Sequence, residues 1–340
     1  MKNLAKFLLG ALLCVGVSSC EDNSQLTSSG DPSYGAKPGS GTPADPAIVF
    51  QGFNTSKGRS RNALFVCDAN GANPTVMVVA PSQIHKYWGQ PTWSGDASAI
   101  SYIEADTGRS ECNLKTTQIS VVAGKATAGT TATLLTVSRA NDSKVMAGGI
   151  WSPTANEIAY SLQETGGTYL TRNSEIRVIP SGGGASELIY SSPDGTSIYH
   201  MAWNADGSKI VVVEWKITSD APLAWENWIK VIDRATGNVE QTISADDLGL
   251  TNCTSITCSR AGLNSLAITN NADVSVYTID LNNPTAATLV QSSALYPSWS
   301  PNNEQLLYRD YSGGMVTETL SSGARTTILQ TNVSVPYWKK

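Results

Sequence analysis

Few residues in this 340-residue chain are of the kinds that carry out catalysis. It contains only two histidines, His85 and His200, and it lacks the sequence motifs of serine hydrolases, zinc proteases, nucleotide-binding loops and calcium loops. Two histidines leave little room for histidine-based catalysis or metal sites. The sequence therefore indicates a binding protein rather than an enzyme, with no cofactor and no metal ion. A lyase or hydrolase that works through His85, His200 and nearby carboxylates is the alternative.

Aromatic side chains offer a second kind of chemistry, the recognition of a ligand by stacking. Trp88 follows His85 and Tyr87 in the segment SQIHKYWGQ, and Trp215 and Trp225 flank a segment that also carries charged residues. An aromatic face beside a few hydrogen-bonding groups suits a peptide or a sugar. The alternative for these tryptophans is that they only cover the sides of the protein.

The aromatic segments are expected at one rim of the protein, where loops come together. Several arginines are expected in or beside loops of the same rim, where together they would suit a ligand that carries a carboxylate. They are Arg59, Arg61, Arg109, Arg139, Arg172 and Arg309. The candidate binding residues as a whole are His85, Tyr87, Trp88, Arg139, His200, Trp215, Trp225 and Arg309. Each arginine, taken alone, is typical of a solvated surface charge.

A repeated segment indicates which elements must position these residues. Trp93, Trp151, Trp203 and Trp299 each end a short apolar stretch and precede a turn rich in Ser, Asn, Pro, Gly or Asp. A second stretch with alternating apolar residues follows, and it carries an aromatic or β-branched residue nine positions after the Trp. Two such stretches around a tight turn predict a β-hairpin.

Two further copies complete the set. Cys258 takes the place of the Trp in a fifth copy, whose turn is one residue longer, and Trp338 begins a sixth copy near the end of the chain. Steps of 58, 52, 55, 41 and 39 residues separate the six positions, against about 40 to 50 residues in a four-stranded propeller blade. Residues 47–53 resemble a second strand without its Trp strand, with Phe50 at the aromatic position. We therefore predict an all-β, six-bladed propeller whose C-terminal strand completes the N-terminal blade.

The repeat resembles a known family. The phrases WSPT, WSPN and WNADG, followed by IAY, LLY and IVV, are similar to the TolB-like (WD40-like, PD40) propeller repeat over about residues 47–340. The resemblance implies a six-bladed propeller of four-stranded blades, and it says little about the ligand. The best-known member of the family has an N-terminal α/β domain that engages the Tol–Pal machinery. In this sequence a predicted tether stands before the propeller instead, so the resemblance does not imply that role. Oligogalacturonate lyases resemble the same repeat class but rely on several metal-binding histidines.

The N-terminus has the pattern of an export signal. Lys2 and Lys6 precede an apolar run, and small residues lead to Cys20. The sequence VSSC resembles the lipobox of bacterial lipoproteins, which implies a signal peptide over residues 1–19 and a lipidated Cys20. Residues 20–46, rich in Ser, Gly, Pro, Asp and Thr, predict a flexible tether before the propeller of residues 47–340. We expect a protein anchored by lipid to the outer membrane, on its periplasmic or cell-surface face.

Four cysteines follow the predicted lipidation site, and an oxidising compartment would allow them to pair. Cys253 and Cys258 enclose only four residues, so we expect a disulfide within one loop. Cys67 and Cys112 are candidates for a second bond between neighbouring blades. Four unpaired, buried thiols are the alternative.

Net charge and motifs together limit the classes of molecule that the protein is expected to bind. The formal charge is −5 and no basic stripe is present, which argues against nucleic acid. The predicted function is that of a monomeric, lipid-anchored envelope propeller that binds a protein or peptide, or serves as a scaffold. A surface lipoprotein that binds a glycan is the second interpretation, and the tryptophans outside the repeat motivate it.

Overall fold

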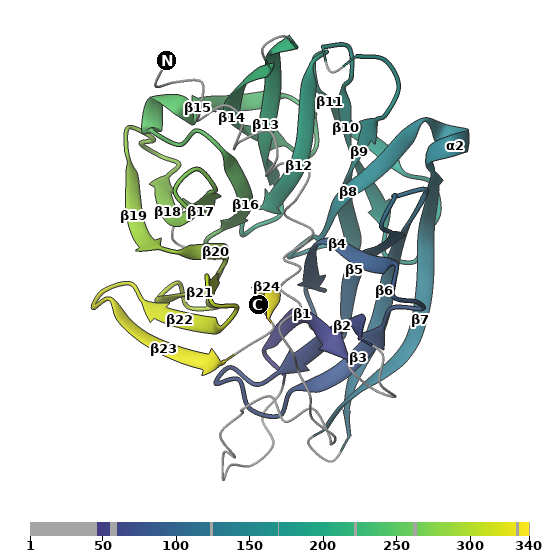
Figure 1. Ribbon diagram of the computed structural model, residues 1–340, viewed down its shortest axis with the longest axis vertical. Coiled ribbons are helices and arrows are strands. Elements are labelled where there is room, and N and C mark those ends of the chain that lie inside the picture. The colour runs from purple at the N-terminus through teal and green to yellow at the C-terminus, as the bar shows by residue number, and fades with distance from the viewer. Residues whose placement is uncertain are drawn as a thin grey trace.

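Antiparallel hairpins dominate the computed structural model, which describes residues 46–54, 60–122, 125–168, 170–220, 223–260, 264–330 and 333–339. The strands form six four-stranded sheets, arranged as blades around a central axis (Figure 1). The predicted signal peptide, Cys20 and nearly all of the tether lie outside the described residues. No helix within the described ranges is long and apolar enough to cross a membrane.

Five blades follow one another along the chain. Blade two contains β4 (His85–Trp93), β5 (Ala99–Asp106), β6 (Glu111–Val122) and β7 (Lys125–Ser138). Blade three contains β8 (Lys144–Trp151), β9 (Glu157–Glu164), β10 (Ser174–Pro180) and β11 (Glu187–Ser191), and blade four contains β12 (Thr196–Trp203), β13 (Lys209–Asp220), β14 (Leu223–Asp233) and β15 (Val239–Ser244). Blade five contains β16 (Cys253–Cys258), β17 (Ser265–Asn270), β18 (Ser275–Asp280) and β19 (Ala287–Ser292), and blade six contains β20 (Ala294–Trp299), β21 (Gln305–Asp310), β22 (Met315–Thr319) and β23 (Ala324–Leu329). Two short helices, α2 (Arg139–Asp142) and η2 (Asp246–Leu248), lie in links between blades.

Blade one joins the two ends of the described chain. Its strands, in spatial order, are β24 (Ser334–Trp338), β1 (Ile48–Asn54), β2 (Arg61–Cys67) and β3 (Thr75–Val79). Ile48 pairs with Trp338, and the backbone N–H of Lys339 donates to the carbonyl of Ala47 at 2.6 Å. The prediction that the C-terminal strand completes the N-terminal blade is confirmed. This pairing closes the ring.

Equivalent residues of the repeat occupy equivalent positions in the blades. In four blades the motif Trp ends the innermost strand and pairs with the residue seven positions later, as Trp151 does with Ile158, whereas Trp338 pairs with Ile48. Cys258 holds the same place in blade five and pairs with Leu266, eight positions later. Phe50 takes the aromatic position in blade one and is fully buried. The predicted six copies, including the altered fifth, are therefore six blades.

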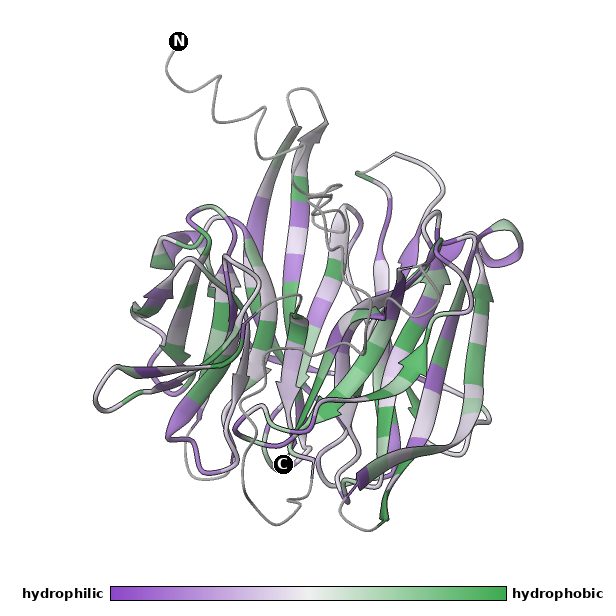
Figure 2. Cartoon of the chain, turned by 60° about the horizontal axis from the view of Figure 1, so that its bottom comes forward, coloured by the Kyte–Doolittle hydropathy of each residue, from purple (hydrophilic) through white to green (hydrophobic). Residues whose placement is uncertain are grey.

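The core is divided among the junctions between blades. Six hydrophobic clusters of described residues each join two neighbouring blades. Hydrophobic and hydrophilic residues alternate along many strands (Figure 2), so that a strand presents apolar side chains to a neighbouring blade. The motif tryptophans add polar contacts. Nε1 of Trp203 donates to the Ile150 carbonyl at 3.2 Å, and Nε1 of Trp299 donates to the Thr257 carbonyl at 3.3 Å, both in the preceding blade.

The predicted disulfides are wrong. Cys253 and Cys258 begin and end the same strand, so their Cα atoms lie roughly 16 Å apart at the usual rise per residue, and a disulfide spans less than about 7 Å. Cys67 and Cys112 belong to different inter-blade clusters. All four thiols are free and buried, and burial raises the pKa of Cys258 to about 12. They serve as small core residues.

The indole of Trp338 should be a main support of ring closure, because it is only 5% exposed and packs at the junction of blades six and one. We expect Trp338→Ala to lower the free energy of unfolding by about 3 to 5 kcal/mol, measured by urea denaturation. The control is Tyr311→Ala, because this side chain is 73% exposed, and it should change stability by less than about 0.5 kcal/mol. Equal effects of the two substitutions would contradict the closing role.

Candidate functional site

The two faces of the ring carry different loops. The links between blades and the turns between second and third strands lie where the innermost strands begin, and we refer to this side as the entry face. The turns that follow the motif tryptophans lie on the opposite side, the motif face. The sequence prediction placed its candidate residues on the entry face.

Only part of the SQIHKYWGQ segment reaches the entry face. His85 is the first residue of β4 and is half-buried, with its Nδ1 atom 2.7 Å from the Ser82 hydroxyl oxygen. Tyr87 is not a rim residue as predicted, because β4 directs it into the cluster between blades one and two. There its ring meets the ring of Tyr102 at 89°, and burial raises the pKa of its hydroxyl.

Trp88 is a packing residue with one charged neighbour. Its side chain packs against the cluster between blades two and three, and the guanidinium carbon of Arg109 lies 4.3 Å from its ring centroid. Arg109 also donates to the Met146 carbonyl at 3.2 Å. Burial lowers the pKa of Arg109. These two side chains form a fixed cation–π pair rather than an open stacking platform.

His200 lies on the innermost strand of blade four, at a shift in the register of β12. Burial lowers the pKa of its imidazole to about 4, so the side chain is neutral near pH 7. His85 lies on blade two, and no hydrogen bond between described residues joins the two histidines. In the part of the chain that the structure describes, no group of three or more His, Cys, Asp or Glu residues is placed to hold a metal ion.

An aromatic group forms on blade four. The rings of Trp215 and Trp225 stack at 12°, with centroids 6.4 Å apart, and Tyr199 meets Trp215 at 67° and 5.8 Å. Nε1 of Trp215 donates to the carbonyl of Cys253 in blade five at 2.9 Å. The structure thus brings both predicted tryptophans into one fixed group at the junction of blades four and five, hereafter the blade-four aromatic group.

The structure places the predicted arginines on several different elements. Arg139 is exposed on α2, which follows blade two, whereas Arg309 lies on β21 of blade six. Arg172 donates from Nε and Nη2 to two carbonyl groups of its own loop. Arg59 lies outside the described residues. A shared carboxylate site at these arginines stays a prediction.

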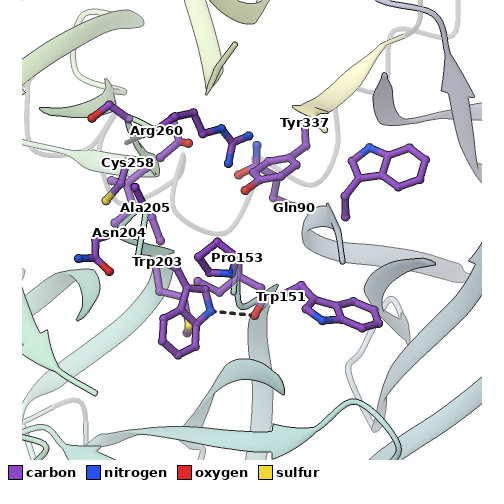
Figure 3. A pocket seen from close by; sticks show the side chains of 16 residues that line it. Gln90, Trp151, Pro153, Trp203, Asn204, Ala205, Cys258, Arg260 and Tyr337 are labelled. Carbon is purple, nitrogen blue, oxygen red and sulfur yellow. Dashed lines mark hydrogen bonds between the residues drawn. The ribbon is translucent and has the colours of Figure 1, made fainter. Parts of the chain in front are cut away.

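A narrow crevice opens at the motif face, where the sequence prediction named no candidate. Residues of blades one to five line it, among them the motif residues Trp93, Trp151 and Trp203 (Figure 3). The empty volume between the lining atoms is about 530 Å³, part of it open to solvent. The lining side chains leave little free space between them.

Arg260 is the charged residue of this crevice. Its guanidinium faces Tyr337 and Gln90 in Figure 3, and its Cζ atom lies 5.9 Å from the Tyr337 ring centroid. Nη2 of Arg260 donates to the Trp338 carbonyl at 3.0 Å, and Nε2 of Gln90 donates to the Pro336 carbonyl at 3.0 Å. The closing strand β24 therefore holds one wall of the crevice in place.

The sequence contained a signal that could have located Arg260. The fifth copy of the repeat has Cys258 where the other copies have Trp, and its longer turn carries Arg260. The fifth copy thus lacks the Trp side chain of the other copies and gains an arginine next to it, so it differs locally from the regular repeat. Such a departure indicates where a propeller has a specialised surface.

Comparisons with known proteins support the fold. No protein-family profile matches the chain, and no curated protein matches its sequence. The solved structure of a TolB-type protein from Agrobacterium tumefaciens matches with a TM-score of 0.50 and 13% identity, covering 85% of this chain and 91% of that one. The fold is that of a TolB-like six-bladed propeller. At this identity the likeness shows the propeller fold alone.

Two other solved structures are similar over most of the TolB-like propeller. An oligogalacturonate lyase in complex with manganese matches with a TM-score of 0.48 and 16% identity, covering 76% of this chain and 74% of that one. Chaetomium thermophilum Sqt1, bound to the N-terminus of ribosomal protein L10, matches with a TM-score of 0.43 and 12% identity, covering 84% of this chain and 73% of that one.

The titration of His200 tests its environment. The unfolded chain takes up a proton at this residue near pH 6.5, but the folded chain does so only near pH 4. The stability that comes from keeping His200 neutral is therefore fully present above pH 6.5 and is lost as the pH falls from 6.5 toward 4. Over this range we expect His200→Gln to lose less unfolding free energy than the wild type. An NMR titration in which the folded His200 imidazole protonates near pH 6.5 would contradict this assignment.

Proposed function

We propose that this protein is a lipid-anchored propeller of the cell envelope that binds a partner protein through the blade-four aromatic group. The resemblance of VSSC to a lipobox supports an anchor at Cys20, and the composition of residues 20–46 supports a tether. A propeller held in this way would present its faces to proteins in the periplasm or outside the cell.

The observation that carries this proposal is the β13–β14 hairpin, which extends past its neighbouring strands at the entry face. The register of β13 with β12 ends at Lys216, and the register of β14 with β15 begins at Trp228. Residues 217–220 and 223–225 therefore pair with one another beyond the ends of both neighbouring strands. Trp225 lies in this projecting part, so its side chain is within reach of a large partner.

The aromatic group is fixed before any partner arrives. The Cys253 carbonyl holds the indole of Trp215, and Trp225 stacks on that indole. Lys216 and Glu226 are cross-strand neighbours on the opposite face of the hairpin, because successive side chains of a strand alternate. A fixed aromatic surface loses little side-chain entropy on binding, and tryptophan is among the most frequent energetic centres of protein interfaces.

A glycan is the alternative ligand for the same surface, because sugar rings also stack on tryptophan. Stacking of a sugar needs an open ring face. Trp215 has Trp225 stacked against it and Tyr199 packed at its side, and both tryptophans are half-buried. This arrangement favours contact with a protein surface, which can use ring edges as well as faces.

Replacing Trp225 should remove the projecting ring and leave the blade intact. With the lipidated full chain as bait in detergent-solubilised envelopes, we expect Trp225→Ala to weaken capture of the partner protein about 30-fold, the effect of losing about 2 kcal/mol at an interface centre. The measurement is quantitative affinity capture with mass spectrometry, followed by titration of the recovered partner.

The matched control is Tyr311→Ala, which removes an exposed aromatic ring from blade six. It should capture the partner as well as the wild type does. Equal capture by the Trp225→Ala variant would contradict the proposed surface. Retardation of the wild type in a polysaccharide gel, with no partner protein recovered, would favour the glycan. A bait absent from the membrane fraction would contradict the anchor.

A further inference from the structure

The crevice at the motif face lies where blade five lacks its indole. Trp203 and Trp299 each donate to the carbonyl that precedes the motif residue of the preceding blade, namely Ile150 and Thr257. By the same geometry, an indole at position 258 would reach the carbonyl of Ala202. Residues 201–205 of blade four and 256–260 of blade five line the crevice on either side of this place. An indole at position 258 would therefore lie beside the crevice and take up space that Cys258 leaves free.

The lining of the crevice has an excess of hydrogen-bond donors. Nε of Arg260 and Nε1 of Trp93 and of Trp151 are buried and meet no acceptor among the described residues. The polar side chains of Gln90 and Asn204 already take part in hydrogen bonds within the chain. A ligand that supplies acceptors alone would complete this set.

The charge of the crevice is also of one sign. Arg260 forms no salt bridge with any described residue, and none of the described lining residues is Asp or Glu. Lys339 adds a second cation, with its Nζ atom 5.7 Å from the ring centroid of Trp93. A half-buried guanidinium that forms no ion pair with a described residue favours an anion with oxygen acceptors, and it binds a planar carboxylate best.

We propose that this crevice binds the C-terminal carboxylate of a peptide, with Arg260 as its main ligand. The small free space between the lining side chains suits a carboxylate at the end of an unbranched chain better than a sugar ring. The Tyr337 ring beside the guanidinium lies on the closing strand β24, so the same strand that closes the ring builds the site. This site is at the motif face, away from the blade-four aromatic group, so the result of a test of one site does not decide the other.

Saturation-transfer NMR on the full chain in detergent tests the proposal with three small probes. N-acetylglycine carries the free carboxylate, N-acetylglycinamide lacks it, and glucuronate carries it on a sugar ring. We expect saturable binding of N-acetylglycine with a dissociation constant on the order of millimolar, and at least about tenfold weaker binding of the other two probes.

Two variants assign the binding to the crevice. Arg260→Gln removes the cation, and Cys258→Trp restores the indole that would fill the space; each should weaken N-acetylglycine binding at least about tenfold. Arg325→Gln is the control, because that arginine is exposed on the outermost strand of blade six, and it should bind like the wild type. If the Arg260→Gln variant does not fold, binding of N-acetylglycine by the Cys258→Trp variant tests the assignment to the crevice.

Three outcomes would overturn the proposal. They are equal binding of the amide, undiminished binding by either crevice variant that folds, and no binding of N-acetylglycine by the wild type. Binding of glucuronate in preference to N-acetylglycine would overturn the peptide terminus as the ligand.

Discussion

The pairing of β24 with β1 is the contact on which the rest of the structure depends. It joins residues almost 300 positions apart in the chain, Ile48 with Trp338, by main-chain hydrogen bonds, and it buries the Trp338 indole between blades six and one. The innermost strands of neighbouring blades touch one another around the axis, so an unpaired first blade would leave one junction open. Closure also sets the positions of the Tyr337 ring and the Trp338 carbonyl, both of which contact Arg260.

Within the closed ring, the two faces differ because single blades depart from the repeat. Blade four lengthens its central hairpin, which carries Trp225 beyond its neighbours on the entry face. Blade five has Cys258 in place of a motif Trp and a longer turn after it, and both Cys258 and Arg260 of that turn line the crevice on the motif face. The regular blades supply a rigid frame, and the irregular ones supply surfaces that suit binding.

The fold could be predicted closely because the residues that define the repeat are large and buried. A Trp at the end of five of the six inner strands and an aromatic residue such as Phe50 on the next strand are fixed by packing between blades. The candidate site was harder to predict. Tyr87 and Trp88 are adjacent in the sequence but face different junctions. Cys253 and Cys258 are close along the chain, yet an extended strand holds them apart. The approach of Arg260 to Tyr337 depends on loop geometry and ring closure, which no local pattern encodes.

We propose that the blade-four aromatic group contacts a partner protein. Photocrosslinking in intact native cells is the most direct test of this contact. A photoreactive amino acid at Thr218, which is exposed on the projecting hairpin, should give one discrete adduct with another protein. The same amino acid at Leu289, 53% exposed on the outer strand of blade five, should give none. The absence of an adduct at Thr218, or the same adduct from both positions, would contradict the account.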